Sequence, residues 1–192
     1  MTATMLGGAL GLLAVSCSGG SDKTADKPRR TTTTAAPTTT TLNPTEAAKQ
    51  AVIKARQSAD QAELNAFGPA HANPDLPAID GTHTGLMLKR IIDTARGLQI
   101  EGIVQRLPAH SKHKLTVKSV RFAKVKGQDV AFLDVCLVED AERVNPKTGK
   151  AFQTGVATFE SSEAMQKVAG LWKLAERRQD KAAEGVAGCA IG

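Results

Sequence analysis

The chain has 192 residues, of which 41% are hydrophobic, 23% charged and 3% aromatic, with no Tyr, one Trp and three Cys. This length suits one domain with additional segments. Beyond the N-terminus no uncharged run approaches the roughly 20 residues that a membrane-spanning helix needs. The absence of Tyr excludes mechanisms that need a phenol, and three Cys without a Cys-x-x-Cys pair give no zinc framework. The net charge of +6 is modest, and with few aromatic rings we expect no nucleic-acid partner.

An apolar stretch at residues 5–15 has the length of a signal-peptide core and is too short to span a bilayer comfortably. Small residues and then Cys17 follow it, which resembles a bacterial lipobox. The resemblance implies that residues 1–16 are a lipoprotein signal peptide. It also implies that Cys17 carries two acyl chains, the number that stable anchoring needs. The first residues lack Lys and Arg, and Ala14 stands where Leu is more usual. An uncleaved anchor, or a cysteine placed there by chance, stays as the alternative.

Residues 17–44 are predicted to be a disordered tether. They contain two runs of four Thr and show no apolar periodicity, so nothing offsets the entropy of ordering them. A flexible chain of this length reaches on the order of 30 Å. The Thr-rich tract is either O-glycosylated or an unmodified linker. Residues 18–44 carry a net charge of +2, which leaves +4 on residues 45–192.

Two helices are predicted at the start of the domain. Asn43, Pro44 and Glu46 form a strong helix start, and Gly68 ends the segment. Its apolar positions recur with a helical period at Ala48, Ala51, Val52, Ala55, Ala59 and Ala62. Residues 71–82 are punctuated by Pro and Gly and are predicted to be a loop. A second helix then follows Thr82 or Thr84, with a stripe of Leu88, Ile91, Ile92, Ala95 and Leu98.

From residue 101 onwards the apolar period changes to two. The predicted strands cover 101–108, 114–126, 130–138, 152–168 and 171–178. Residues 130–138 are apolar on both faces, which is typical of a central strand. Two helices followed by hairpins in series predict an α+β domain over residues 45–192.

The two cysteines of the domain are Cys136 and Cys189. If Cys17 is acylated, they are the only intramolecular pair, and a lipoprotein domain lies outside the cytoplasm, where disulfides persist. Closing a loop of about 50 residues contributes roughly 4 kcal/mol in the chain-entropy treatment. The alternative is two free thiols, with Cys136 as a small buried hydrophobe.

Several short motifs occur in a recognisable order along the chain. They are Asn73-Pro74-Asp75-Leu76-Pro77, Thr84-Gly85, Gly102, Val117, Val120, Ala131, Val135 with Cys136, Thr148-Gly149, Gly170-Leu171-Trp172-Lys173-Leu174 and Gly188-Cys189. Over residues 45–192 this order resembles the nuclear-transport-factor-2-like (SnoaL-like, cystatin-like) domain of a group of actinobacterial lipoproteins. The resemblance implies a cone-shaped, strongly curved antiparallel sheet packed on two N-terminal helices, with a pocket at the open end. It implies little about function, because most members have no known activity.

The pocket candidates are Asp134, Phe132 and Trp172. The fold that the chain resembles hosts isomerases and dehydratases, and a general base in such an enzyme needs a water-poor pocket that raises its pKa. Asp134 lies between Phe132 and Cys136 on one face of the central strand and is the best remaining carboxylate. The alternative is that Asp134 lies in a wet environment or pairs with a Lys or Arg.

The histidines and acidic residues give no metal site. His110 and His113 lie in a basic segment with no third ligand, whereas zinc takes three or four protein ligands. We therefore predict an exposed basic loop there, with no metal and no cofactor. The acidic cluster at residues 139–142 lacks the ligand spacing of a calcium loop.

Three hypotheses for the function follow. The leading one is a lipid-anchored binding or interaction module on the outer face of the membrane, without catalysis, whose partner is a small apolar ligand or a protein. The second is a small isomerase or dehydratase that uses Asp134. The third is a surface lipoprotein encoded by a phage or mobile element that acts in exclusion.

Overall fold

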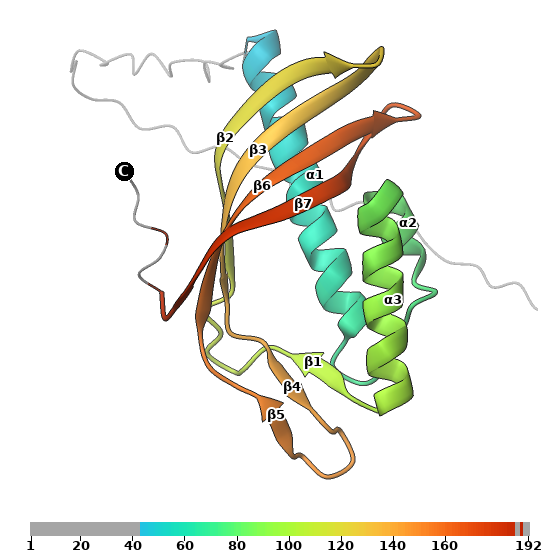
Figure 1. Cartoon of the computed structure of the whole chain (residues 1–192), viewed down its shortest axis with the longest axis vertical. Coiled ribbons are helices and arrows are strands. Elements are labelled where there is room, and N and C mark those ends of the chain that lie inside the picture. The colour runs from blue at the N-terminus through green and yellow to red at the C-terminus, as the bar shows by residue number, and fades with distance from the viewer. Residues whose placement is uncertain (1–42, 187–188, 190–192) are drawn as a thin grey trace, which may run out of the picture. The chain divides into compact units, whose positions relative to one another are not determined.

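The structure is a computed structural model that describes residues 43–186 and 189. The expected signal peptide, Cys17 and all but the last two residues of the expected tether lie outside the described residues. The helices are α1 (Pro44–Phe67), α2 (Pro77–Thr82) and α3 (Gly85–Glu101) (Figure 1). The strands are β1 (Val104–Arg106), β2 (Lys114–Val125), β3 (Gln128–Glu139), β4 (Glu142–Val144), β5 (Ala151–Gln153), β6 (Ala157–Val168) and β7 (Leu171–Glu184).

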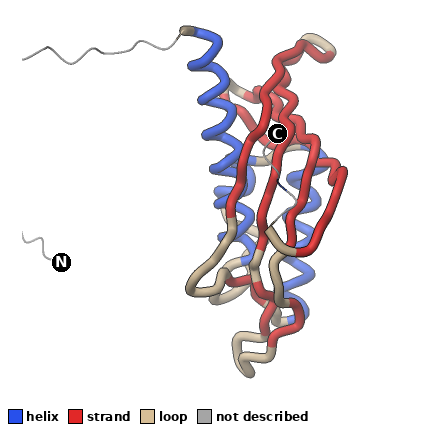
Figure 2. The backbone as a smooth tube through the Cα atoms, turned by 90° about the vertical axis from the view of Figure 1, so that its left-hand side faces the viewer, coloured by secondary structure: helices blue, strands red, loops and turns tan. Residues whose placement is uncertain are grey.

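The strands form two antiparallel sheets. The larger one has the order β2-β3-β6-β7, and the smaller one has the order β1-β4-β5. The smaller sheet lies at the opposite end of the domain from the tips of the β2–β3 and β6–β7 hairpins (Figures 1 and 2). The α+β class expected from the sequence is therefore confirmed, and β3 is a central strand, paired on both sides.

Helix α1 begins and ends where local chemistry predicts. The side chain of Asn43 accepts a hydrogen bond from the backbone N–H of Glu46 at 2.9 Å, and Pro44 occupies the first helical position. At the other end, the N–H of Gly68 donates to the carbonyl of Leu64 at 3.0 Å. A Cβ at Gly68 would lie 2.6 Å from the carbonyl oxygen of Asn65, so only glycine fits this close approach.

The segment predicted to be a loop at residues 71–82 contains helix α2, so that prediction is wrong for Pro77–Thr82. Pro77 provides a first helical residue, and burial of Ile79 in the core holds the short helix in place. Helix α3 then continues through Gly97 to Glu101 and ends at Gly102, which has φ +63°. Only residues 104–106 of the strand predicted at 101–108 are extended.

Both long hairpins turn through two residues with positive φ, Lys126-Gly127 and Ala169-Gly170. Such type I′ turns match the twist of antiparallel strands. The single strand predicted at residues 152–168 is instead two strands, β5 and β6, interrupted near Gly155. Strand β4 was not predicted.

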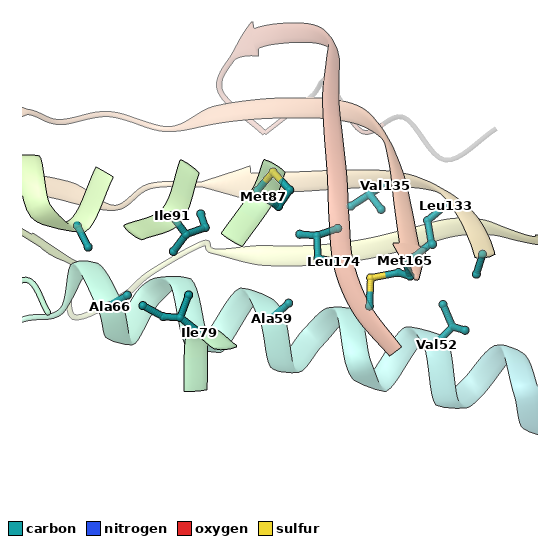
Figure 3. Packing of buried hydrophobic residues seen from close by; sticks show 12 residues of the cluster. Val52, Ala59, Ala66, Ile79, Met87, Ile91, Leu133, Val135, Met165 and Leu174 are labelled. Carbon is teal, nitrogen blue, oxygen red and sulfur yellow. The ribbon is translucent and has the colours of Figure 1, made fainter. Parts of the chain in front are cut away.

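The core lies between the helices and one face of the larger sheet, which we call the inner face (Figure 3). Val52 and Ala59 of α1 and Ile91 of α3 belong to the same buried cluster as Leu133 of β3 and Leu174 of β7. Because side chains alternate along a strand, the neighbours of Leu133 project from the opposite, outer face of the sheet.

On that outer face the structure joins Cys136 of β3 to Cys189 by a disulfide, with 5.8 Å between the Cα atoms. The chain after β7 also bonds to β6, where the Thr158 hydroxyl donates to the Gly185 carbonyl at 2.5 Å. The Gly185 N–H donates to the carbonyl of Val156 at 2.8 Å. These contacts hold the described C-terminal residues against the sheet, and Cys136 is fully buried.

Candidate ligand cavity

A cavity of about 220 Å³ lies between the C-terminal half of α1, helix α3 and the inner face of the larger sheet; we call it the inner cavity. Its apolar lining consists of Leu64, Phe67, Met87, Ile91 and Leu137. Its charged lining consists of Asp60, Glu63, Arg90, His113, Glu139, Arg143 and Arg177. A second cavity of about 120 Å³ shares Leu137, Glu139 and Arg177 with it. The inner cavity therefore offers both apolar contact and fixed charge.

Four charged side chains form a continuous hydrogen-bonded chain beside the cavity. The Arg56 guanidinium donates to both carboxylate oxygens of Glu163, with 3.0 Å between Nη2 and Oε1. Arg177 donates through Nε to Glu163 at 2.8 Å and through its two terminal nitrogens to Glu63 at 2.7 and 3.0 Å. Arg56 and Glu163 are 0% and 3% exposed. Such bidentate contacts compensate for the loss of hydration of the buried charges.

The ionisation of Glu63 is shifted strongly by this chain. Burial alone would raise the pKa of Glu63, but the charge of Arg177 and the hydrogen bonds from Arg177 and His83 lower it to about 2. The pKa of Arg177 is raised in turn by Glu63 and Glu163, against the opposing effect of its burial. Both groups are therefore charged at neutral pH.

His83, in the link between α2 and α3, is buried and contacts the same Glu63 oxygen, Oε1, as Nη2 of Arg177. Its Nε2 lies 3.1 Å from a Glu63 oxygen, and its Nδ1 lies 2.9 Å from the Thr82 hydroxyl.

The segment before β2 is a loop in which His110 and Lys112 are exposed, as predicted, but His113 is not exposed. The His113 side chain is 11% exposed, and its Nε2 lies 2.8 Å from an Asp60 carboxylate oxygen. The hydrogen bond to Asp60 raises the pKa of His113, against the lowering effect of burial, and the charges of Asp60, Glu139 and Asp140 add to the rise. The Nδ1 atom is buried and has no hydrogen-bond partner among the described residues. It is therefore a buried polar atom whose hydrogen-bonding capacity is unused by the described residues.

The backbone around His113 is held by short polar contacts. The His113 N–H donates to the Ser111 hydroxyl at 3.0 Å, and that hydroxyl donates to Asp140 at 2.5 Å. Asp140 also accepts from the backbone N–H of Lys112. The acidic cluster at residues 139–142 therefore contributes to the position of His113 through Asp140.

The three pocket candidates from the sequence do not line the inner cavity. Asp134 projects from the outer face, where it is half-buried and accepts a hydrogen bond from the Ser119 hydroxyl. Phe132 projects from the same face and lines a depression there. Trp172 packs against Phe122 at the hairpin tips, with 5.9 Å between ring centroids. None of the three therefore lines the inner cavity, and on β3 the alternation puts Leu133 and Val135 on the inner face instead.

Across residues 43–186 and 189, no three His, Cys, Asp or Glu side chains converge in the arrangement of a metal site. None of the helices described by the structure is both long enough and apolar enough to cross a membrane.

Known proteins give information on the fold of this chain only. The chain matches no protein-family model and no curated protein. Among solved structures it is similar to the intermembrane space region of the chloroplast protein ARC6. The two are 23% identical with a TM-score of 0.51, and the match covers 66% of this chain and 91% of that one. At this identity the likeness shows a shared α+β fold and carries no statement about activity.

Proposed function

We propose that the protein is a lipid-anchored, extracytoplasmic module that binds a small ligand in the inner cavity without catalysis. The observation that carries this proposal is a cavity lined both by apolar side chains and by charged side chains that hydrogen bonds hold in place. Its volume lies below the roughly 300–1,000 Å³ of pockets for drug-sized ligands. We therefore infer a small amphiphilic ligand, with an apolar part against Leu64 and Ile91 and a polar group near the charged lining residues Arg90 and Arg143.

The family and the location belong to the same proposal. We infer a nuclear-transport-factor-2-like domain with a cone-shaped, strongly curved sheet. The order of helices before hairpins and a cavity between helices and sheet support this inference. The apolar stretch at residues 5–15 and the small residues around Cys17 support a lipid anchor on the outer face of the membrane.

Ligand binding is testable with hexanoate, 1-hexanol and hexylamine as amphiphilic probes. Methyl NMR should show shifts of Leu64, Met87 and Ile91, which line the cavity. Thr94→Phe, which adds a ring at the cavity lining, should abolish these shifts. The same substitution at the exposed Thr154 should leave them unchanged. The proposal fails if no probe shifts these methyls, or if the shifts persist in Thr94→Phe.

The anchor is tested independently by metabolic labelling with a radioactive fatty acid and by flotation with membranes. The native chain should carry label and float, and Cys17→Ala should do neither. A Cys17→Ala protein that keeps its lipid would refute the anchor.

A second candidate function is proton transfer by the Asp60–His113 pair, and the place of this hydrogen-bonded pair in the cavity lining favours it. An imidazole held by a carboxylate through one nitrogen can donate and recover a proton through the other, an effect that contributes about 10²–10⁴ in rate. The assay is deuterium uptake from heavy water next to the carbonyl of small ketones. His113→Gln and Asp60→Asn should abolish uptake, whereas Asp134→Asn should retain it. A wild-type protein that gives no uptake contradicts this candidate.

A further inference from the structure

The two long hairpins end side by side, at the same end of the domain as the start of α1 (Figure 1). We call residues 121–129 and 166–173 the hairpin end. The Gln166 side chain donates to the Gln128 side chain, which ties the two hairpins together. A cavity of about 420 Å³ at this end is lined by Ala48 of α1 with Phe122 and Trp172. Because Ala48 belongs to the first turns of α1, the start of this helix lies close to the hairpin end.

Large apolar side chains are exposed at the hairpin end. Phe122 and Val125 are each 42% exposed and Leu171 is 60% exposed, beside the half-buried Trp172. Val125 and Leu171 come directly before and after the two turns, so they lie close to the tips. Exposed apolar groups that cluster in this way mark an interaction surface more often than singly scattered ones do.

The positive charge of the domain is concentrated at the same place. Residues 45–192 contain 21 basic and 17 acidic side chains, and the hairpin end contains five basic and one acidic, so the remainder has sixteen of each. The five are Arg121, Lys124, Lys126, Lys167 and Lys173. The excess of +4 on residues 45–192 thus equals the charge of the hairpin end.

We propose that the hairpin end docks on the anionic surface of the bilayer in which Cys17 is anchored. The inference rests on the lipid anchor of the proposed function. Lysines attract anionic lipid headgroups, and apolar and Trp side chains at the tips enter the interfacial layer. Pro44, the first residue of α1, lies at this same end of the domain. Anchoring also supplies a high effective concentration, so a weak intrinsic affinity is sufficient.

A second copy of the chain fits this surface less well. Apposing two hairpin ends would bring two clusters of net positive charge together, and like charges across an interface oppose association. An anionic lipid surface instead complements both the charge and the apolar tips.

Trp172 is the only tryptophan and lies at the hairpin end, so it reports docking directly. The experiment uses the full lipidated chain reconstituted in phosphatidylcholine vesicles with and without phosphatidylglycerol. Each preparation is made with ordinary or dibrominated phosphatidylcholine, because bromine quenches a tryptophan that contacts the acyl chains. The ratio of Trp172 emission in brominated vesicles to that in ordinary vesicles corrects for changes in emission that do not come from contact with bromine. We expect quenching in the anionic vesicles, little in the neutral ones, and relief by high salt.

Paired variants identify the surface. Replacing both Lys126 and Lys167 by Gln should lower the docking constant about 30-fold, the factor for two lysines at an anionic surface. Val125→Ser with Leu171→Ser should also reduce quenching. Matched controls lie in the β4–β5 region at the other end: Lys147→Gln with Lys150→Gln, and Phe152→Ser, whose side chain is 54% exposed. In these control variants Trp172 should be quenched as strongly as in the native chain.

The outcomes separate docking from anchoring. A chain that floats with membranes but shows no anionic-dependent quenching overturns docking and leaves the anchor intact. A chain that carries no lipid, yet is quenched when added to anionic vesicles, supports docking and overturns the anchor. Self-association in detergent that Val125→Ser abolishes, without quenching in vesicles, would assign the surface to a second copy and overturn the proposal.

Discussion

Replacing Glu163 by Gln is expected to destabilise the fold more than any surface change. In the native chain Glu163 is the acceptor for Arg56 and for Nε of Arg177. Arg177 keeps its two bonds to Glu63 after the substitution. Arg56 loses its close carboxylate: it is 0% exposed, its Nη1 has no hydrogen-bond partner among the described residues, and Asp60 lies 3.8 Å from that nitrogen. Leaving a buried charge unpaired costs about 3–5 kcal/mol.

For a domain of about 150 residues this loss corresponds to a fall in Tm on the order of 10 °C. Urea unfolding followed by Trp172 fluorescence measures the free energy directly. The control is Glu160→Gln on the same strand, where the carboxylate pairs with Lys118 at 2.6 Å on the outer face. We expect that control to change stability far less, because exposed pairs contribute little. Equal effects of the two substitutions would refute the reasoning from burial.

Three further outcomes follow from the same geometry. His113 should titrate above 6.5, and Asp60→Asn should lower that pKa in an NMR titration; because the folded pKa is raised, the stabilisation is complete below about pH 6.5 and is lost as the pH rises through the folded pKa. An unchanged pKa in Asp60→Asn would contradict the pairing. The pKa of Glu63 is about 2 in the fold against an ordinary 4.5, so its stabilisation is present above pH 4.5 and is lost as the pH falls toward 2. Between these pH values the unfolding free energy of Glu63→Gln should therefore fall by about 3 kcal/mol less than that of the native chain. An identical fall in both proteins would count against the ion pair. Reduction of Cys136–Cys189 should lower the unfolding free energy by about 4 kcal/mol, with Cys136→Ser as the reductant-insensitive control; two titratable thiols in the native protein would exclude the bond.

The elements that the sequence predicts well are those with local signals. Helix α1 follows from Asn43, Pro44 and a 3.6-residue apolar period, all within one segment. The hairpin turns follow from Gly127 and Gly170 between alternating strands. Helix α2 has no such signal, because its six residues are held by the burial of Ile79 against other elements.

The inner cavity depends on contacts that no local pattern contains. Asp60 and His113 are 53 residues apart and meet only when α1 packs on the sheet. One signal was present: Arg56 lies four residues after Val52 and three before Ala59 on the apolar face of α1. A charged residue within an apolar stripe indicates a buried partner.

The position of Asp134 relative to the core could not be predicted for a different reason. The alternation correctly put it on one face with Phe132 and Cys136, but both faces of β3 are apolar, so the pattern does not say which face meets the helices. The disulfide to Cys189 explains this ambiguity, since it buries Cys136 on the face opposite the core.

Helix α1 sets how far the inner cavity stands from the bilayer. Its 24 residues begin at the hairpin end, and the cavity residues of α1 start at Asp60. With a rise of 1.5 Å per residue, Pro44 and Asp60 are about 24 Å apart along the helix axis. If the domain docks by its hairpin end with α1 along the bilayer normal, the cavity would lie beyond the headgroup layer, which is about 5–8 Å thick on each side. A ligand of the inner cavity would then enter from water rather than by lateral diffusion out of the membrane, and the length of α1 would set this distance.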